Sequence, residues 1–452
     1  MRDCTKIAFL FISLVLLFVV TAGCSPNEEP SQGDKVLRIA VDSKGEYDYK
    51  YRDYVEAAFP GLKVELIELE EDYKPRLSIQ EFMKKIETEK PDLILTSSYR
   101  YVQLAEKGLV ADLSVRLAES GMTEDDFYPG MIEWVKQASG GRLSGIAPFF
   151  QSSVLYYNET LFKKYGIELP HDGMTLEEVI ELASRFTSGG GSKDGIVGMH
   201  QPFSNLPYNV LSQFAMSEGI RDVTFSRGKV SMDTPLWRHI IETVINLYES
   251  GTLSTKEVKG KMINGVLTFD KEATEQANLF EQGKAAMSIG YYGISYNTEK
   301  FKTGYVEPPV SSKDRLSSSN IYIFNIMAIG AEAKNAETAW DVIRFMTSDH
   351  MAKIQSKLSS DTASSGFPTR KSYLNYVQDP IIGRLFQLKP VYSTAEPEIE
   401  TVYDGRKFYL LFEELVNKEM AAAIKGEKSV DEIIKTIQKD GQALLDAAKK
   451  TK

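Results

Sequence analysis

Residues 91–113 read PDLILTSSYRYVQLAEKGLVADL. The apolar run at 92–96 is typical of a buried strand, and residues 97–100 form a short polar loop after it. A helix is predicted for 101–107, because a glycine follows it immediately. A buried strand that leads through a polar loop into a helix is typical of a parallel α/β sheet.

The residues upstream repeat this alternation. Two strands are predicted from VLRIAVD at 36–42 and from LKVELIEL at 62–69, which alternates over its first five residues. Helical patterns follow at 53–59 and 79–88. Strands that alternate with helices predict parallel strands joined by crossover helices, so the fold class is α/β.

Later helices are marked by their first residues. Capping boxes at Thr175–Glu178 and Ser429–Glu432 each precede an apolar helical face. Thr234-Pro235 starts a third helix, and residues 335–346 form a fourth. Within this fourth helix Trp340 has helical spacing among apolar residues, which predicts a place in the core.

Composition excludes several classes of protein. The 452 residues include 53 Lys and Arg against 63 Asp and Glu, a net charge of −10. This acidic balance argues against a nucleic-acid binder, which needs a basic face. With 42% hydrophobic and 26% charged residues, the chain is unlike a wholly disordered protein. Its length suggests about two to three domain-sized units.

The N-terminal residues set the expected compartment. Residues 1–23 combine a charged start, an apolar run and the small pair Ala22-Gly23, as secretory signals do. Cys24 follows directly, which resembles a bacterial lipobox, although Thr21 stands where Leu is usual. The mature chain is therefore expected to begin at Cys24 with an acylated thiol, and residues 24–35 form a polar tether. The alternatives are an ordinary cleaved signal or an uncleaved anchor.

No catalytic or metal-binding motif is present. The four histidines lack close metal-ligand spacing, and no phosphate-binding loop or nucleophile elbow occurs. Cys4 lies inside the predicted signal, so Cys24 is the only cysteine expected in the mature chain. No catalytic residue, metal or cofactor is predicted. A hydrolase stays open, because sequence cannot show whether two carboxylates face each other.

Four further segments complete a pattern that begins with residues 91–113. They are GIAPFFQSSVLYYNETLF at 145–162, a proline–threonine–helix step at 170–187, FEQGKAAMSIG at 280–290, and residues 336–370 with the turn Gly366-Phe-Pro-Thr-Arg370. In this order the segments resemble the family-1 extracellular solute-binding proteins of bacterial ABC importers, to which maltose-binding proteins belong. One departure is Leu176, where the family usually has Trp.

The resemblance implies a two-lobed, periplasmic-binding-protein-like α/β fold of the class II type. Each lobe would be a sheet flanked by helices, and a hinge would join the lobes. The expected first lobe is 36–147 with about 308–365, and the second is 148–307 with about 366–452. Chain crossings are expected near 146–151, 304–310 and 366–370.

Ten candidate ligand contacts follow from the resemblance and from polar residues placed after strands. They are Asp42 and Lys44 after the first strand, Ser98, Tyr99 and Arg100 after the strand at 92–96, Gln151 at the hinge, Gln201 and Phe203, and Tyr291 and Tyr292. Tyr99 and Arg100 would lie on one lobe, and Gln151 and the Tyr pair on the other. The alternatives are that Arg100 is solvated or pairs with an acid, and that the Tyr pair packs in the core.

The function that these features indicate is a non-enzymatic receptor, a monomer that captures an extracellular small solute, most simply a carbohydrate. Its partners would be two ABC permease subunits with a separate ATPase, and the membrane through a lipid anchor. The expected location is the outer face of a Gram-positive cell membrane. The alternatives are a secreted polysaccharide hydrolase, and a ligand sensor that reports to a membrane kinase.

Overall fold

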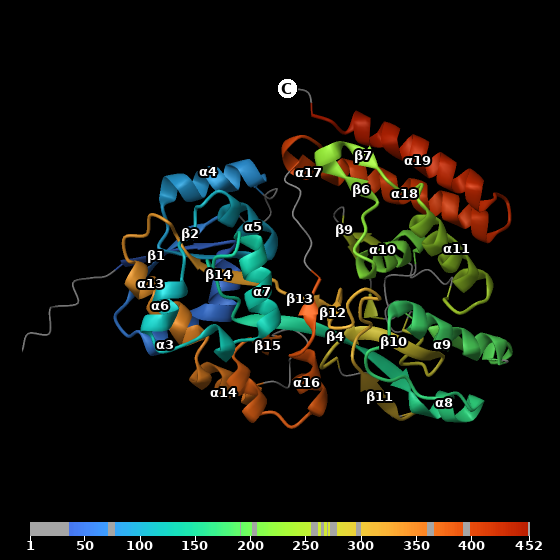
Figure 1. Ribbon diagram of the computed structural model, residues 1–452, viewed down its shortest axis with the longest axis horizontal. Helices are drawn as coiled ribbons and strands as arrows, with labels where there is room; N and C mark the ends of the chain where they lie inside the picture. Colours follow the sequence, from blue (N-terminus) through green and yellow to red (C-terminus); the bar gives the residue numbers. More distant parts are fainter. Residues whose placement is uncertain are drawn as a thin grey trace, which may run out of the picture.

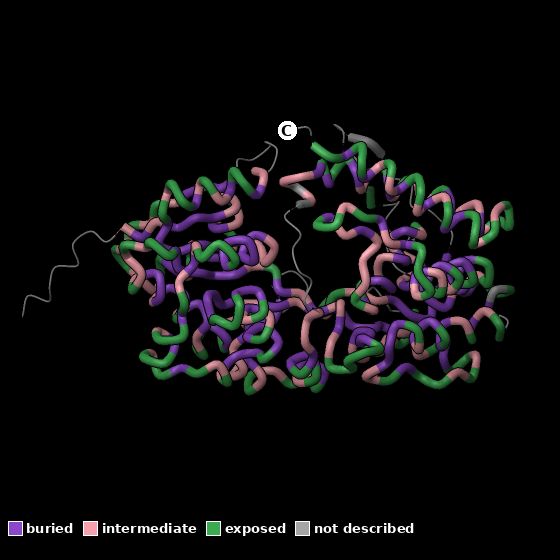
Figure 2. Tube along the Cα trace, turned by 45° about the horizontal axis from the view of Figure 1, so that its top comes forward, coloured by how far each residue is buried: buried purple, intermediate pink, exposed green. Residues whose placement is uncertain are grey.

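The computed structural model describes residues 36–70, 77–189, 191–200, 206–254, 261–263, 266–268, 270–271, 278–294, 300–358, 366–391 and 398–450. The molecule has two lobes of mixed α/β structure, which lie side by side in Figure 1. Buried residues concentrate separately in the two halves (Figure 2). The predicted fold class is thereby confirmed.

The sheet of the first lobe has the strand order β14-β3-β1-β2. These strands are β14 (Asn325–Ile329), β3 (Leu93–Ser97), β1 (Val36–Val41) and β2 (Lys63–Glu68). β1 runs parallel to β2 and β3, as predicted, with Ala40 opposite Ile94. β14 returns from far along the chain and is antiparallel to β3. The chain therefore leaves this lobe and comes back to complete its sheet.

Helices surround this sheet. α5 (Ser98–Glu106) packs on β3 and β14, and α13 (Ala336–Met346) packs on β14. The others are α2 (Lys44–Tyr47), η1 (Asp48–Arg52), α3 (Asp53–Ala58), α4 (Ile79–Glu89), α6 (Ser114–Glu119), η2 (Glu124–Asp126), α7 (Pro129–Ala138) and α14 (Asp349–Leu358).

The sheet of the second lobe has the order β11-β4-β10-β5, and two short strands pair with β4. Its strands are β4 (Phe149–Asn158), β5 (Val197–Met199), β10 (Ala285–Tyr291), β11 (Thr303–Val306), β13 (Ile321–Tyr322) and β15 (Phe367–Pro368). Short two-stranded pairs are β6 (Val223–Thr224) with β7 (Lys229–Val230), β8 (Lys261–Ile263) with β9 (Val266–Thr268), and β12 (Ser317–Ser318) with β16 (Lys389–Pro390).

Two groups of helices build the rest. α8 (Glu159–Tyr165) and α9 (Leu176–Ser188) pack on the second sheet. α10 (Pro207–Ser217), α11 (Pro235–Glu249), α18 (Gly405–Ile424) and α19 (Val430–Ala447) pack on one another, as Figure 1 shows. Short helices are η3 (Gly191–Asp194), η4 (Phe225–Arg227), η6 (Lys371–Asn375), α16 (Pro380–Leu385) and α17 (Glu398–Thr401).

Strand β4 links the two cores. Phe150 and Val154 belong to the first hydrophobic cluster, whereas Leu155 belongs to the second. β13 and β15 pair with the N-terminal half of β4, through Gln151–Ser152 and Phe149–Phe150. Three chain segments therefore run together between the lobes.

Capping boxes located two helix starts correctly. Both predicted capping boxes are present, at Thr175 and Ser429. Trp340 is 5% exposed in the first cluster, which confirms its predicted core position. The predicted loop at 97–100 is wrong, because α5 already begins at Ser98. The side chain of Ser97 accepts a hydrogen bond from the Arg100 N–H and caps this helix directly after β3.

The packing also bears on where the chain passes between lobes. Gly304 lies within β11 of the second sheet, and the crossing at 304–310 stays a prediction. Phe367, Tyr373 and Phe386 pack in the first cluster, although the predicted boundary put residues from 366 onward in the second lobe.

None of the helices in the described part of the chain has the length and hydrophobicity that crossing a bilayer requires.

Candidate ligand-binding site

Residues of both lobes line a cavity of about 410 Å³, here called the cleft. Ser98, Tyr99 and Trp134 come from the first lobe. Arg221, Phe225 and Tyr409 come from the second. Tyr322 and Phe324, which lie on and just after β13, contribute from the connecting segments.

The first-lobe wall follows from the β3–α5 connection. Because β3 ends at Ser97 and α5 begins at once, Ser98 and Tyr99 occupy the first turn of that helix. Trp134 lies on α7 and packs beside Tyr101, with ring centroids 6.2 Å apart. The Tyr101 hydroxyl forms a hydrogen bond with Ser144 Oγ over 2.7 Å. This wall is therefore held by buried neighbours.

The second-lobe wall is aromatic with one cation. Phe225 contacts Tyr409 of α18, with ring centroids 5.8 Å apart. The backbone carbonyl of Arg221 accepts a hydrogen bond from Trp237 Nε1 over 3.3 Å. Next to it, Asp222 accepts from the Tyr208 hydroxyl over 2.8 Å, and burial raises the pKa of Asp222. The Trp237 bond to its carbonyl and the Tyr208 bond to the next side chain thus hold the backbone at Arg221 in place.

The connecting segments supply further rings. Tyr322 and Phe324 stack with centroids 5.6 Å apart and an interplanar angle of 21°. Phe324 is 44% exposed, and Tyr291 contacts Tyr322 with centroids 5.8 Å apart. An exposed ring supported by a second ring offers a flat apolar face to a ligand.

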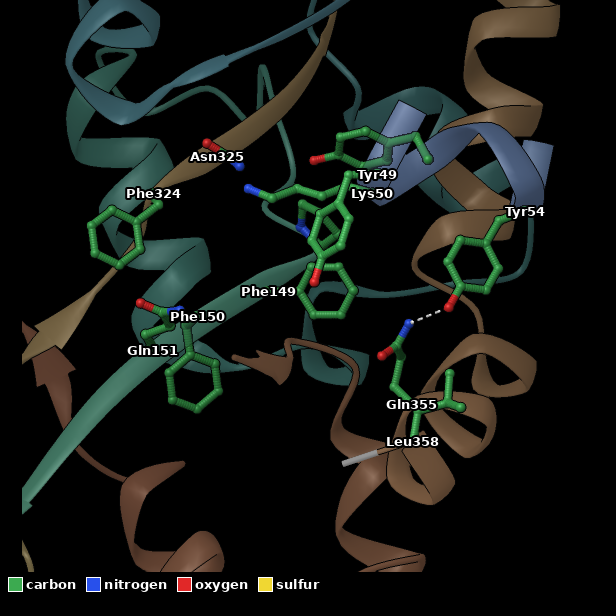
Figure 3. A pocket seen from close by; sticks show the side chains of 12 residues that line it. Tyr49, Lys50, Tyr54, Phe149, Phe150, Gln151, Phe324, Asn325, Gln355 and Leu358 are labelled. Carbon is green, nitrogen blue, oxygen red and sulfur yellow. Dashed lines mark hydrogen bonds between the residues drawn. The ribbon is translucent and has the colours of Figure 1, made fainter. Parts of the chain in front are cut away.

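A smaller cavity of about 250 Å³ adjoins the cleft and shares Phe324 with it (Figure 3). Gln151 and Asn325 line it beside Phe324, and Tyr49 and Lys50 of η1 line it as well. The Lys50 ammonium pairs with Glu46 over 2.8 Å, and Asn325 Nδ2 donates to the same carboxylate oxygen over 3.0 Å. This cavity therefore adds amide and ammonium groups next to the aromatic cleft.

Arg100 and Asp42 contact each other. The guanidinium of Arg100, whose side chain is 9% exposed, donates to Asp42 Oδ1 over 2.8 Å and also to Glu70. This arrangement corresponds to the alternative in which Arg100 pairs with an acid. Burial is the main effect that raises the pKa of Asp42, and the Arg100 charge opposes it. Direct binding of a solute by Asp42, Lys44 or Arg100 stays a prediction.

The other predicted residues divide among different places. Ser98 and Tyr99 line the cleft, and Gln151 lines the adjoining cavity. Tyr291 contacts Tyr322, but Tyr292 lines a separate cavity and donates a hydrogen bond to Asp379 over 2.8 Å. The structure therefore does not bring the Tyr pair to one site. Gln201, Phe203 and Cys24 lie outside the described residues.

Sequence reasoning missed Trp134, Arg221, Phe225 and Tyr409. Each lies in a segment that carries no ligand motif, and Trp134 has the spacing of an ordinary amphipathic helix. Only the packing of the lobes brings them together. Arg221 is the one charged residue among the described residues that line the cleft.

In the described part of the chain, no group of three or more His, Cys, Asp or Glu side chains is placed to hold a metal ion. No Asp or Glu is among the described residues lining the cleft or the adjoining cavity. The arrangement suits a neutral or anionic ligand with apolar faces.

The sequence model of the bacterial extracellular solute-binding proteins matches residues 42–353, more than half of the chain. The chain belongs to this family. Among curated members, the putative ABC transporter periplasmic-binding protein YcjN of Escherichia coli K12 is 22% identical over 266 residues, which are 58% of this chain and 60% of YcjN. The sn-glycerol-3-phosphate-binding periplasmic protein UgpB of Agrobacterium fabrum is 24% identical over 206 residues, 43% of this chain and 46% of UgpB.

The matches therefore span about half of these relatives' length. Structural similarity covers more of the chain than these sequence matches do. The sugar-binding protein MalE from Xanthomonas citri superposes with a TM-score of 0.61 over 91% of this chain and 98% of that protein, at 11% identity. This solute-binding protein therefore shares the two-lobed fold across nearly its whole length.

Proposed function

We propose that this protein is the solute receptor of an ABC importer and captures a carbohydrate in its cleft. The observation that carries this proposal is the aromatic lining supplied from both lobes. Tyr99 and Trp134 line the cleft from one side, Phe225 and Tyr409 from the other, and Phe324 from the connecting segments.

The chemistry of a sugar matches such a lining. A pyranose presents C–H groups on its faces and hydroxyls at its edge, so an aromatic ring can cover the face. Ligand sites are usually apolar with a few placed polar groups. Here the Ser98 hydroxyl and Arg221 supply them, and Gln151 and Asn325 follow in the adjoining cavity.

A phosphorylated polyol is the second candidate solute. Arg221 favours such a ligand, because its guanidinium group can bind two phosphate oxygens at once. UgpB of Agrobacterium fabrum, one of the relatives, is named for binding sn-glycerol 3-phosphate. A sugar would use the rings more than Arg221, and a polyol phosphate would use Arg221 more than the rings.

Binding without turnover is the proposed activity. Most glycosidases place two carboxyl groups on either side of the bond that breaks. The described residues that line the two cavities include no carboxylate, and Asp42 and Glu70 are both engaged by Arg100. These observations favour a receptor over a hydrolase.

The proposed mechanism is closure of the lobes over the solute by bending at the connecting strands. Delivery would be to a two-subunit permease with a separate ATPase, from the outer face of the membrane, with attachment through Cys24. We place the lobe boundary so that residues 366–391 move with the first lobe, since Phe367 and Phe386 pack in its core.

Native mass spectrometry of freshly purified protein tests the proposal, because a retained solute would appear as an added mass. Thermal shifts with oligosaccharides and with sn-glycerol 3-phosphate would then show whether the solute is a carbohydrate or a polyol phosphate. A ligand that binds only the native state at 100 times its Kd adds about 2.7 kcal/mol to the unfolding free energy. Release of free sugar from oligosaccharides at enzymatic rates would favour the hydrolase. A neighbouring pair of permease genes would favour import over sensing.

A further inference from the structure

A third cavity, of about 430 Å³, lies on the other side of the Tyr291–Tyr292 pair. Tyr291 contacts Tyr322, which lines the cleft, whereas Tyr292 lines this separate cavity. β10 ends at Tyr291, and Tyr292 is the first residue of the turn that follows, so the two rings face different cavities. The cavity is rich in tyrosine, and its five tyrosines are Tyr156, Tyr292, Tyr305, Tyr373 and Tyr376.

The rings stand at steep angles to one another. The ring centroid of Tyr305 lies 5.9 Å from that of Tyr292, with an interplanar angle of 90°. It also lies 5.9 Å from the ring centroid of Tyr156, with an interplanar angle of 69°. Tyr305 and Tyr376 are each 39% exposed, so their rings can be reached from solvent. Because the rings are inclined to one another, their π faces surround the cavity from several directions.

One carboxylate completes the cavity. Asp379 Oδ2 accepts hydrogen bonds from the hydroxyls of Tyr292, at 2.8 Å, and Tyr305. Asp379 Oδ1 accepts from the Ile381 N–H over 3.1 Å, which fixes the carboxyl group at the start of α16. Burial is the first cause that raises the pKa of Tyr305 to about 12, so its hydroxyl stays a donor at neutral pH.

We propose that this cavity is a second ligand site, which binds a small organic ammonium ion. The described lining residues include one carboxylate and neither Lys nor Arg, so the charge suits a cation. Tyrosine faces attract cations through the ring quadrupole, and quaternary ammonium groups are recognised by aromatic cages. The chain's own Lys353 ammonium lies over the outer ring, Tyr376, at 6.0 Å from its centroid. This proposal does not depend on the function of the cleft.

Choline and its neutral carbon analogue, 3,3-dimethylbutan-1-ol, are matched probes for calorimetric titration of the full chain. Choline should bind saturably, and the neutral analogue should bind at least about tenfold more weakly, because only the charge differs. Asp379→Asn should weaken choline binding by at least about tenfold through loss of the opposite charge. Asn keeps the helix cap, so this variant is expected to fold.

Variants of Tyr305 provide a second, independent test of the ammonium site. Tyr305→Leu removes the π face and should weaken choline binding several-fold, whereas Tyr305→Phe keeps the ring and should stay close to the wild type. Trp134→Ala, in the cleft, should leave choline binding unchanged. No saturable binding, equal binding of the neutral analogue, or loss of choline binding in Trp134→Ala would overturn the proposal.

Discussion

The guanidinium of Arg100 donates a hydrogen bond to Asp42 over 2.8 Å and a second one to Glu70, while its carbon lies 4.8 Å from the centre of the Phe82 ring. Arg100 therefore ties the start of α5 to the ends of β1 and β2. Since Tyr99 precedes Arg100 on the same helical turn, this cluster sets the position of a cleft residue.

Replacing Arg100 by Gln should lower the unfolding free energy by about 3 kcal/mol, because two partly buried carboxylates lose their shared counter-ion. The matched control is Arg344→Gln, whose exposed pair with Asp341 should contribute less than about 0.5 kcal/mol. Urea unfolding of both variants measures the difference. Direct solute binding by Arg100 would instead appear as weaker affinity with stability intact.

His200 should make stability depend on pH. Its side chain is 1% exposed, neither ring nitrogen has a hydrogen-bond partner among the described residues, and burial lowers its pKa to about 4. Between this value and the ordinary pKa of about 6.5, the unfolded chain binds more protons than the folded one. Stability should therefore fall with decreasing pH, by about 1–2 kcal/mol from pH 7 to pH 5.

Unfolding at both pH values, in the wild type and in His200→Gln, isolates this contribution. His200→Gln should flatten the pH dependence. An unchanged pH dependence in His200→Gln would contradict the assignment.

Two glycines should respond to alanine in opposite directions. A Cβ added at Gly198 of β5 would lie 2.1 Å from the carbonyl oxygen of Ala183 on α9. Gly198→Ala should therefore destabilise by about 1–3 kcal/mol through overpacking. Gly383, within α16, has nothing within 4 Å of an added Cβ, so Gly383→Ala should stabilise by about 0.5–1 kcal/mol. Thermal melts of both variants check this, and a neutral Gly198→Ala would show that α9 is not packed tightly on β5.

Local patterns predicted the three parallel strands of the first lobe and two helix starts of the second lobe. The apolar runs of β1, β2 and β3 and the capping boxes of α9 and α19 depend on neighbouring residues only, so sequence was enough to locate them. The start of α5 was misplaced because Ser97 can act as a loop residue or as a cap, and only the backbone decides which.

The site was harder to predict, because packing between distant segments forms it. Trp134, Arg221 and Tyr409 are far apart in the chain, and no local pattern distinguishes them from core or surface residues. Tyr291 and Tyr292 show the related difficulty that the last residue of β10 and the first residue of the turn after it face different cavities. Sequence could place aromatic residues near the hinge, but could not tell which cavity each one lines.

Titration calorimetry with the solute found by native mass spectrometry tests the cleft most directly. Trp134→Ala and Tyr409→Ala, one from each lobe, should each raise Kd by roughly tenfold, since each removes a contact worth about 1.4 kcal/mol. Trp340→Phe, in the core of the first lobe, should lower the melting temperature and leave Kd unchanged. Unchanged affinity in both cleft variants, with each still folded, would contradict the claim that the two lobes hold the solute between them.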